Sequence, residues 1–206
     1  MEHLRPALLL TGFFVVVTGL AFPVAIWGIG SVTFPSQAKG SLIRDAHGAV
    51  IGSALIGQAF AKPEYFHPRP SAAGTGYDAA NSSGTNLGPT SDKLIHGIPD
   101  DPATKDVDES YAGFVDLAKA YRAENGLAPD TVIPADAATR SASGLDPDIS
   151  PANAELQVAR VAKARGLAPE QVQTIVAANT TGRTLGVFGE PRVNVLGLNL
   201  ALDSFE

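Results

Sequence analysis

The sequence predicts an α+β protein: a single N-terminal transmembrane helix followed by one mixed α/β domain with long loops rich in Gly, Ser and Pro. Residues 6–30 are almost wholly apolar and carry no charge. Beyond them, apolar residues recur at helical spacing in three segments, and short β-prone runs lie near both ends of the remaining chain. The 21 Gly and 15 Pro make loops abundant.

The first element is an anchor in the membrane. As a helix, residues 6–30 would measure about 37 Å, enough to cross a hydrocarbon core about 30 Å thick. A cleavable signal peptide is the rival interpretation, because Arg5 is basic and residues 36–38 read Ser-Gln-Ala. The apolar part of a signal peptide has only about 7–15 residues, so we favour a permanent anchor. The chain thus divides into a transmembrane helix, 6–30, and a soluble mixed domain, 31–206.

Small residues repeat along this helix. Thr11-Gly12 and Thr18-Gly19 are seven positions apart, which places them on one side of a regular helix. Small residues allow close approach of two helices in lipid, so we expect Thr11, Gly12, Thr18 and Gly19 to pack against a partner helix. Gly and Thr are also common in membrane helices generally, and this ordinary interpretation stays open.

The charges that flank the anchor favour one orientation. Arg5 is closer to the apolar segment than Lys39 and Arg44 on the other side. Because Lys and Arg near a span face the cytoplasm, we expect a cytoplasmic N-terminus and an extracytoplasmic domain.

Composition excludes several function classes. The formal net charge is −6, without a basic cluster, which gives no electrostatic basis for binding nucleic acid. The chain has no cysteine, so disulfides, thiolate metal sites and cysteine nucleophiles are excluded.

The first half of the domain is predicted to be a hairpin and a long loop. Residues 41–44 and 50–53 are β-prone runs around a Gly-containing turn, and residues 55–58 should continue the second strand. Residues 63–106 lack periodicity, although their aromatic side chains favour an ordered loop. An acidic linker ends this loop at Asp100, Asp101, Asp106 and Asp108.

The second half should contain three helices and a strand. The first helix begins near Asp108, presents Tyr111, Val115, Ala118 and Tyr121 on one face, and ends at Gly126. The second runs from the N-cap Ser150 to Gly166, and the third from Pro169 to residues 180–182. Residues 193–202 alternate in hydropathy from Leu196 onward, which predicts a strand with one covered face.

Two loops and one helix flank are candidates for binding. Residues 82–86 and 141–147 could present backbone amides to an anion, although a turn with Asp146 or Ser150 as helix cap is the simpler interpretation. The second helix has a polar, basic flank formed by Gln157, Arg160, Lys163 and Arg165. Such a flank is usually a solvated face, and Arg165 in the last turn suits the helix dipole. Gln157 and Arg160 could instead meet a partner or a phosphate. No hydrolase motif and no set of metal ligands is present, so we expect neither a catalytic residue nor a metal site.

Five clusters in order make the chain resemble a known family, the C subunits of Kdp potassium-transporting P-type ATPases. These clusters lie at 65–72 (YFHPRPSA), 82–88 (SSGTNLG), 143–151 (SGLDPDISP), 157–162 (QVARVA) and 189–199 (GEPRVNVLGLN). The chain departs modestly from the family pattern at Ser83, Thr85 and Asp148.

The resemblance implies an accessory subunit of a bacterial plasma-membrane complex that imports K⁺ with ATP. Its partners would be a pore-forming subunit and a catalytic subunit, besides the lipid bilayer. The chain itself would not be an enzyme and would hold no cofactor of its own; ATP would be bound through the catalytic subunit.

The resemblance leaves two roles open. In one, the domain stabilises the complex and supports the pore subunit from outside, with Tyr65, Phe66, Arg69, Ser71 and Asn86 in the interface loops. In the other, a catalytic chaperone raises the ATP affinity of the catalytic subunit, and Ser143, Gly144, Asp146, Gln157 and Arg160 meet the nucleotide or the partner. A membrane-tethered hydrolase ranks below both.

Overall fold

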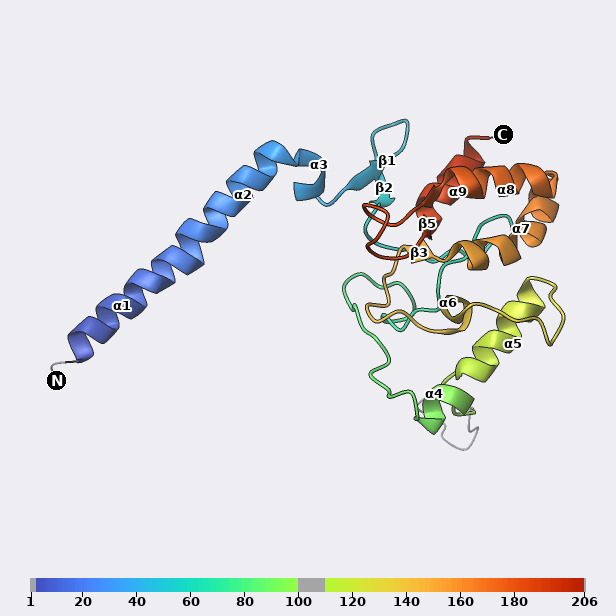
Figure 1. Ribbon diagram of the computed structural model, residues 1–206, viewed down its shortest axis with the longest axis horizontal. Helices are drawn as coiled ribbons and strands as arrows, with labels where there is room; N and C mark the ends of the chain where they lie inside the picture. Colours follow the sequence, from blue (N-terminus) through green and yellow to red (C-terminus); the bar gives the residue numbers. More distant parts are fainter. Residues whose placement is uncertain (1–2, 100–109, 206) are drawn as a thin grey trace. The chain divides into compact units, whose positions relative to one another are not determined.

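The computed structural model describes residues 3–99 and 110–205. The chain divides into two compact units, Met1–Ser53 and Ala54–Glu206 (Figure 1).

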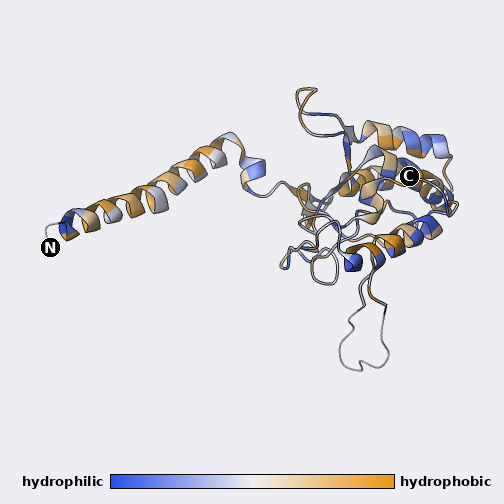
Figure 2. Cartoon of the chain, turned by 60° about the horizontal axis from the view of Figure 1, so that its bottom comes forward, coloured by the Kyte–Doolittle hydropathy of each residue, from blue (hydrophilic) through white to orange (hydrophobic). Residues whose placement is uncertain are grey.

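The first unit begins with one continuous helix from Leu4 to Thr33. It consists of α1 (Leu4–Val16), a π-helical turn η1 (Val17–Ala21) and α2 (Phe22–Thr33). Its 30 residues bury no side chain and are apolar enough to cross a membrane, as the hydropathy colouring of Figure 2 illustrates. The apolar helix expected from the sequence is confirmed.

The π-helical turn has a cause in the sequence. It ends at Ala21, two positions before Pro23, whose ring would clash with the carbonyl group of Gly19 in a regular α-helix. A wider turn relieves this clash. The placement of Thr11-Gly12 and Thr18-Gly19 on one side of the helix supposed a regular α-helix. The π-helical turn changes the angle between these two pairs around the helix axis.

A short helix and a hairpin complete the first unit. Helix α3 (Pro35–Ala38) precedes strands β1 (Leu42–Arg44) and β2 (Val50–Ser53), which pair antiparallel as predicted. Asp45 shapes the turn, because its Oδ1 accepts hydrogen bonds from the amides of His47 and Ala49 at 2.8 and 2.9 Å.

The expected extension of the second strand over residues 55–58 is wrong. The strand ends at Ser53, and a turn follows at residues 54–55. The amide of Gly57 instead donates to the carbonyl oxygen of Leu145 at 2.9 Å, so this stretch packs on a loop and not along a strand.

The second unit holds the remaining elements. In chain order they are α4 (Asp92–His96), α5 (Phe114–Glu124), α6 (Ala135–Ala138), β3 (Asp148–Ile149), α7 (Pro151–Arg165), α8 (Pro169–Ala178), β4 (Thr180–Thr181), β5 (Arg192–Asn194) and α9 (Val195–Asp203). The strands form an antiparallel sheet in the order β3-β5-β4. Helices α7, α8 and α9 gather beside this sheet, and α4 and α5 lie at the other end of the unit (Figure 1). The α+β prediction is confirmed.

The core of this unit lies among α7, α8, α9 and the sheet. Its fully buried members include Phe66 from the long loop, Val161, Val172, Val193 and Leu198. The loop thus contributes the largest side chain of the core, so it is an integral part of the fold.

Helices α7 and α8 confirm their predictions. Ser150 caps α7 by accepting from the amide of Asn153 at 3.1 Å, and Gly166 ends the helix with a left-handed φ of 68°. Helix α8 begins at Pro169 and buries Val172, Ile175 and Val176, as expected. It ends at Ala178, and residues 180–181, where the sequence predicts the end of the helix, form strand β4 instead.

The predictions for α5 are partly wrong. The predicted start near Asp108 and the acidic linker lie outside the described residues. Tyr111 pairs with Ile98 in an isolated bridge before the helix, and Val115 is exposed. Tyr121 is buried and Gly126 follows the helix, as predicted. Helix α4 interrupts the segment that the sequence predicts to be loop throughout.

The predicted strand at 193–202 is wrong from Val195 onward. Only Arg192–Asn194 is strand; the side chain of Asn194 then accepts from the amide of Gly197 at 2.9 Å and starts α9. Val195, Leu198, Asn199 and Leu202 are buried, which is a helical spacing.

Candidate functional site

Side chains from α7 and α9 bind the backbone of residues 63–67, which we call the clamped segment. Arg160 donates from Nη1 to the carbonyl oxygens of Pro63 and Tyr65 at 2.7 and 2.9 Å. Arg165 donates from Nε to the carbonyl oxygen of Glu64 at 2.8 Å. The carbonyl groups of residues 63–65 therefore each meet a guanidinium group.

The next two residues are each bound at both backbone groups by one side-chain amide. Asn199 accepts from the Phe66 amide at 2.8 Å and donates to its carbonyl oxygen at 3.0 Å. Gln157 does the same for His67, at 2.7 and 3.0 Å. These side chains satisfy a backbone that forms no strand, so the loop can be buried without unpaired polar groups.

Gln157 is therefore not part of an exposed polar flank, which corrects the sequence interpretation. Gln157 is only 1% exposed, and its side-chain amide also donates to Asn153 Oδ1 at 2.9 Å and accepts from Arg160 Nη2 at 2.8 Å. The Arg165 side chain is buried as well, and it pairs with Asp203 at 2.6 Å.

A hydrogen bond between two side chains joins the clamped segment to α5. His67 Nδ1 lies 2.6 Å from Glu124 Oε1, and the other ring nitrogen lies 2.9 Å from the carbonyl oxygen of Lys62. The hydrogen bond from His67 lowers the pKa of Glu124, and the charge of Arg160 acts in the same direction.

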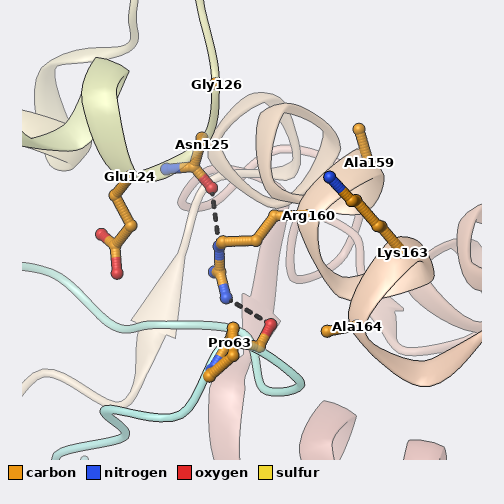
Figure 3. Close-up of a pocket in the computed structure, with 8 residues that line it drawn as sticks. All are labelled: Pro63, Glu124, Asn125, Gly126, Ala159, Arg160, Lys163 and Ala164. Carbon is orange, nitrogen blue, oxygen red and sulfur yellow. Dashed lines mark hydrogen bonds between the residues drawn. The ribbon is translucent and has the colours of Figure 1, made fainter.

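A pocket of about 460 Å³ opens beside Arg160. Figure 3 shows the guanidinium group between Asn125, at the end of α5, and Pro63, with Lys163 on the same helix. Nε of Arg160 donates to Asn125 Oδ1 at 3.0 Å. Burial lowers the pKa of Arg160. Lys163 lines the same pocket and is exposed to solvent.

The two Gly-rich loops pack against each other and form what we call the loop junction (residues 71–77, 82–84 and 141–146). Ser83 donates from its amide, and Ser82 from its hydroxyl, to the carbonyl oxygen of Ser143 at 3.0 and 2.9 Å. Ser71 Oγ donates to the carbonyl oxygen of Gly144 at 2.7 Å.

Arg69 links the clamped segment to this junction. Its Nη1 lies 2.8 Å from Asp146 Oδ2, and the hydroxyl of Tyr77 donates to the Arg69 carbonyl oxygen at 2.9 Å. Burial, reinforced by the charge of Asp146, raises the pKa of Tyr77. Asp146 also accepts from the amide of Asp148 at 3.1 Å. The turn-and-cap interpretation of the 141–147 loop is confirmed by this contact and by the Ser150 cap.

The structure thus separates the predicted site residues into groups. Tyr65, Phe66, Gln157 and Arg160 meet at the clamped segment, whereas Arg69, Ser71, Ser143, Gly144 and Asp146 meet at the loop junction. Asn86 is exposed, with a φ of 53°, and makes none of these contacts.

Sequence reasoning missed two partners of these groups. Asn199 lies in the Leu-rich run that the sequence predicts to be a strand. If the run is considered as a helix, Asn199 is a polar residue on its buried face, and this was the available signal that it binds a polar partner. The other missed partner is Asn153, whose Oδ1 accepts from the hydroxyl of Tyr121 at 2.8 Å and from the side-chain amide of Gln157 at 2.9 Å. Asn153 thereby connects the hydrogen bonds of the clamped segment to α5.

The four anchor residues occupy α1 and η1. A Cβ atom at Gly12 or Gly19 would meet no atom within 4 Å, and Thr18 Oγ1 donates to the carbonyl oxygen of Phe14 at 2.7 Å. Within residues 3–99 and 110–205, no three His, Cys, Asp or Glu side chains are grouped to hold a metal ion.

Comparison with known proteins identifies the family of this chain. Residues 4–204 match the KdpC family, described as the c chain of the K⁺-transporting ATPase. The potassium-transporting ATPase KdpC subunit of Caulobacter sp. (strain K31) is 54% identical over 204 residues, which cover 99% of this chain and 94% of that protein. The KdpC subunit of Mycobacterium tuberculosis (strain H37Rv) is 50% identical over 202 residues, 98% of each chain. The chain therefore belongs to the KdpC family of K⁺-transporting ATPase subunits.

Proposed function

We propose that this chain is a non-catalytic accessory subunit of a high-affinity, ATP-driven K⁺ import complex in a bacterial plasma membrane. It assembles and stabilises the complex, and it supports the pore-forming subunit from outside the membrane. A separate catalytic subunit hydrolyses ATP.

The engagement of Gln157 and Arg160 by contacts inside the domain carries this proposal. All bonding positions of the Gln157 side-chain amide are used, and Arg160 donates to Asn125, Pro63, Tyr65 and Gln157 with four of its five N–H groups. A nucleotide phosphate could bind the Gln157 amide, or take more than one hydrogen bond from Arg160, only if some of these bonds broke, and broken buried bonds are costly. The residues fit a scaffold that keeps a long loop rigid for a partner.

The orientation of the anchor is part of the proposal. Arg5 favours a cytoplasmic N-terminus, which places the domain outside. Because ATP is cytoplasmic, a domain on the outer side cannot touch it.

Protease treatment of intact spheroplasts tests the orientation. We expect the domain to be digested from outside, whereas a cytoplasmic marker protein survives. Protection of the domain in intact spheroplasts, with digestion only after lysis, would contradict the proposal. Deletion of this chain tests the role: the remaining subunits should no longer purify as a stable, K⁺-transporting complex.

The catalytic chaperone is the second candidate, and the pocket beside Arg160 favours it. Lys163 is an exposed cation at that pocket, and a ternary complex with nucleotide would need such a group. In this case Lys163→Ala should raise the KM for ATP of the whole complex without loss of assembly. Under the accessory role, the same variant leaves the KM unchanged.

A membrane-tethered hydrolase is the lowest-ranked candidate. It would require hydrolytic activity of the chain purified alone, and we expect none above a buffer control.

A further inference from the structure

The connection between β4 and β5 forms an exposed hairpin with an apolar tip. We call residues 183–190 the apolar hairpin. Three large apolar side chains stand at this tip: Leu185 is 85% exposed, Val187 70% and Phe188 65%. Every residue from 181 to 191 is exposed, so neighbouring elements of this unit do not cover the tip.

The backbone of the hairpin is nevertheless well defined. Thr184 and Phe188 exchange both backbone hydrogen bonds, at 2.8 and 2.9 Å, and the amides of Gly186 and Val187 donate to Arg183 and Thr184. The base is rooted in the sheet, where Thr180 pairs with the fully buried Val193. The tip is therefore displayed by a structured support.

Leu185 has a backbone conformation that non-glycine residues rarely adopt. Its φ is 54°, in the left-handed region, and the following Gly186 has a φ of 76°. Such a conformation is unfavourable for a residue with a Cβ atom and tends to be kept where function requires it. The Leu185 side chain is exposed to water, so it contributes no hydrophobic free energy to the folding of this chain.

The hairpin carries no free charge at its tip. Residues 184–189 are uncharged, and the charges at the base, Arg183 and Glu190, pair with each other at 2.6 Å. A partner surface therefore needs no compensating charge, and it must be apolar to gain from covering the tip.

We propose that the apolar hairpin is a docking element that inserts Leu185, Val187 and Phe188 into an apolar pocket of another subunit of the same ATPase complex. This inference rests on the proposed accessory function and names the part of the domain that makes the contact. A protein pocket fits better than a bilayer surface, because a fixed, strained backbone suits a partner of defined shape, whereas lipid sets no such requirement.

The absence of cysteine makes a direct test possible. A Val187→Cys chain, labelled with a benzophenone maleimide and assembled into the complex in mild detergent, should crosslink to one partner subunit on illumination. The matched control is Val132→Cys, because Val132 is 89% exposed on a different loop. Crosslinking above the control, with the partner identified by mass spectrometry, supports the proposal. Crosslinks to lipid or detergent alone would overturn it, as would equal maleimide reactivity of the thiol introduced at position 187 in the free chain and in the complex.

A second variant measures the contribution to binding. Leu185→Ser with Val187→Ser leaves the backbone bonds of the hairpin in place and should reduce retention of this chain in the purified complex by about ten- to a hundredfold. Val132→Ser should have no effect. Full retention of the double variant would also overturn the proposal.

These outcomes are distinguishable from failure of the proposed function. If the other subunits assemble and transport K⁺ without this chain, the accessory role fails. If assembly needs this chain but position 187 stays open to reagent in the complex, only the docking role of the hairpin fails.

Discussion

Arg160 illustrates how the contacts of a residue in the fold can differ from those that its sequence context suggests. A cation on a helix flank suggests a phosphate ligand when only the sequence is considered. In the folded domain, its guanidinium group bonds to Asn125, Pro63, Tyr65 and Gln157 and connects three segments far apart in the sequence. Hydrogen bonds to a charged group contribute more than neutral ones, so this residue should matter first for stability.

Replacement of this residue should destabilise the domain. Arg160→Ala leaves two carbonyl oxygens of the clamped segment without their donor, and we expect the free energy of unfolding to fall by about 2–3 kcal/mol. Arg160→Lys should recover only part, because an ammonium group lacks the planar fork. Denaturant unfolding followed by circular dichroism measures the change.

Lys163→Ala is the matched control for this measurement. It removes an exposed cation one turn along the same helix, and stability should change by less than about 0.5 kcal/mol. Equal stability of Arg160→Ala and the parent chain would contradict the structural role of Arg160.

Glu124 should give the domain a specific sensitivity to acid. Its pKa is lowered in the folded state by the hydrogen bond from His67, relative to an ordinary value of 4.5. The pair therefore contributes stability above pH 4.5, and this contribution is lost as pH falls through the lower folded-state pKa. Glu124→Gln should flatten the pH dependence of unfolding in this acidic range.

The parent chain, unfolded in the same buffers, is the reference for this titration. An unchanged slope for Glu124→Gln, measured by thermal unfolding from about pH 3 to pH 6, would refute the role of the contact between His67 and Glu124.

At the scale of elements, local signals predicted α7 and misled at α9. The N-cap Ser150, Pro151 and the terminal Gly166 lie within or beside α7, so its bounds follow from nearby sequence. In α9, alternating leucines match a strand, but the cap of Asn194 and burial at positions 195, 198, 199 and 202 select a helix. Short apolar runs carry both periods, and tertiary packing decides between them.

The loop junction depends on close approach of backbones. Gly144 has a φ of 69°, and a Cβ atom there would lie 2.7 Å from Ala73 and from the carbonyl oxygen of Ser83. Gly144→Ala should therefore combine the cost of a left-handed φ with a clash, and we expect a loss of more than about 2 kcal/mol.

Gly126→Ala separates these two effects. Gly126 has a similar φ of 64°, but a Cβ atom there meets nothing within 4 Å. It should lose only about 1 kcal/mol. Equal losses for the two variants, measured by denaturant unfolding, would show that close packing at the junction contributes nothing.

At the scale of the whole molecule, the sequence predicted the family and the fold class better than the contacts inside the domain. The clusters around Tyr65, Ser143 and Gln157 were recognised, and the family is confirmed. Several of their contacts join residues far apart in the sequence: 61 positions for Ser82 with Ser143, 90 for His67 with Gln157 and 133 for Phe66 with Asn199. No local pattern encodes such pairings, because a side-chain amide that binds a loop backbone leaves no periodic signal.

The small residues of the anchor should make it a docking helix for a partner in the membrane. In the chain alone, Gly12 and Gly19 face open space, and none of the helix is buried. Gly12→Leu and Gly19→Leu therefore add side chains at no steric cost to this chain. If small residues let a partner helix approach closely, each variant should lower retention of this chain in the detergent-purified complex by about tenfold.

The control variant is Leu10→Phe. Position 10 lies about 160° around α1 from Gly12, so this substitution adds bulk on another side of the helix and should leave retention unchanged. Full retention and K⁺ transport by both glycine variants would refute the packing role, because only contact with a partner can make these substitutions costly.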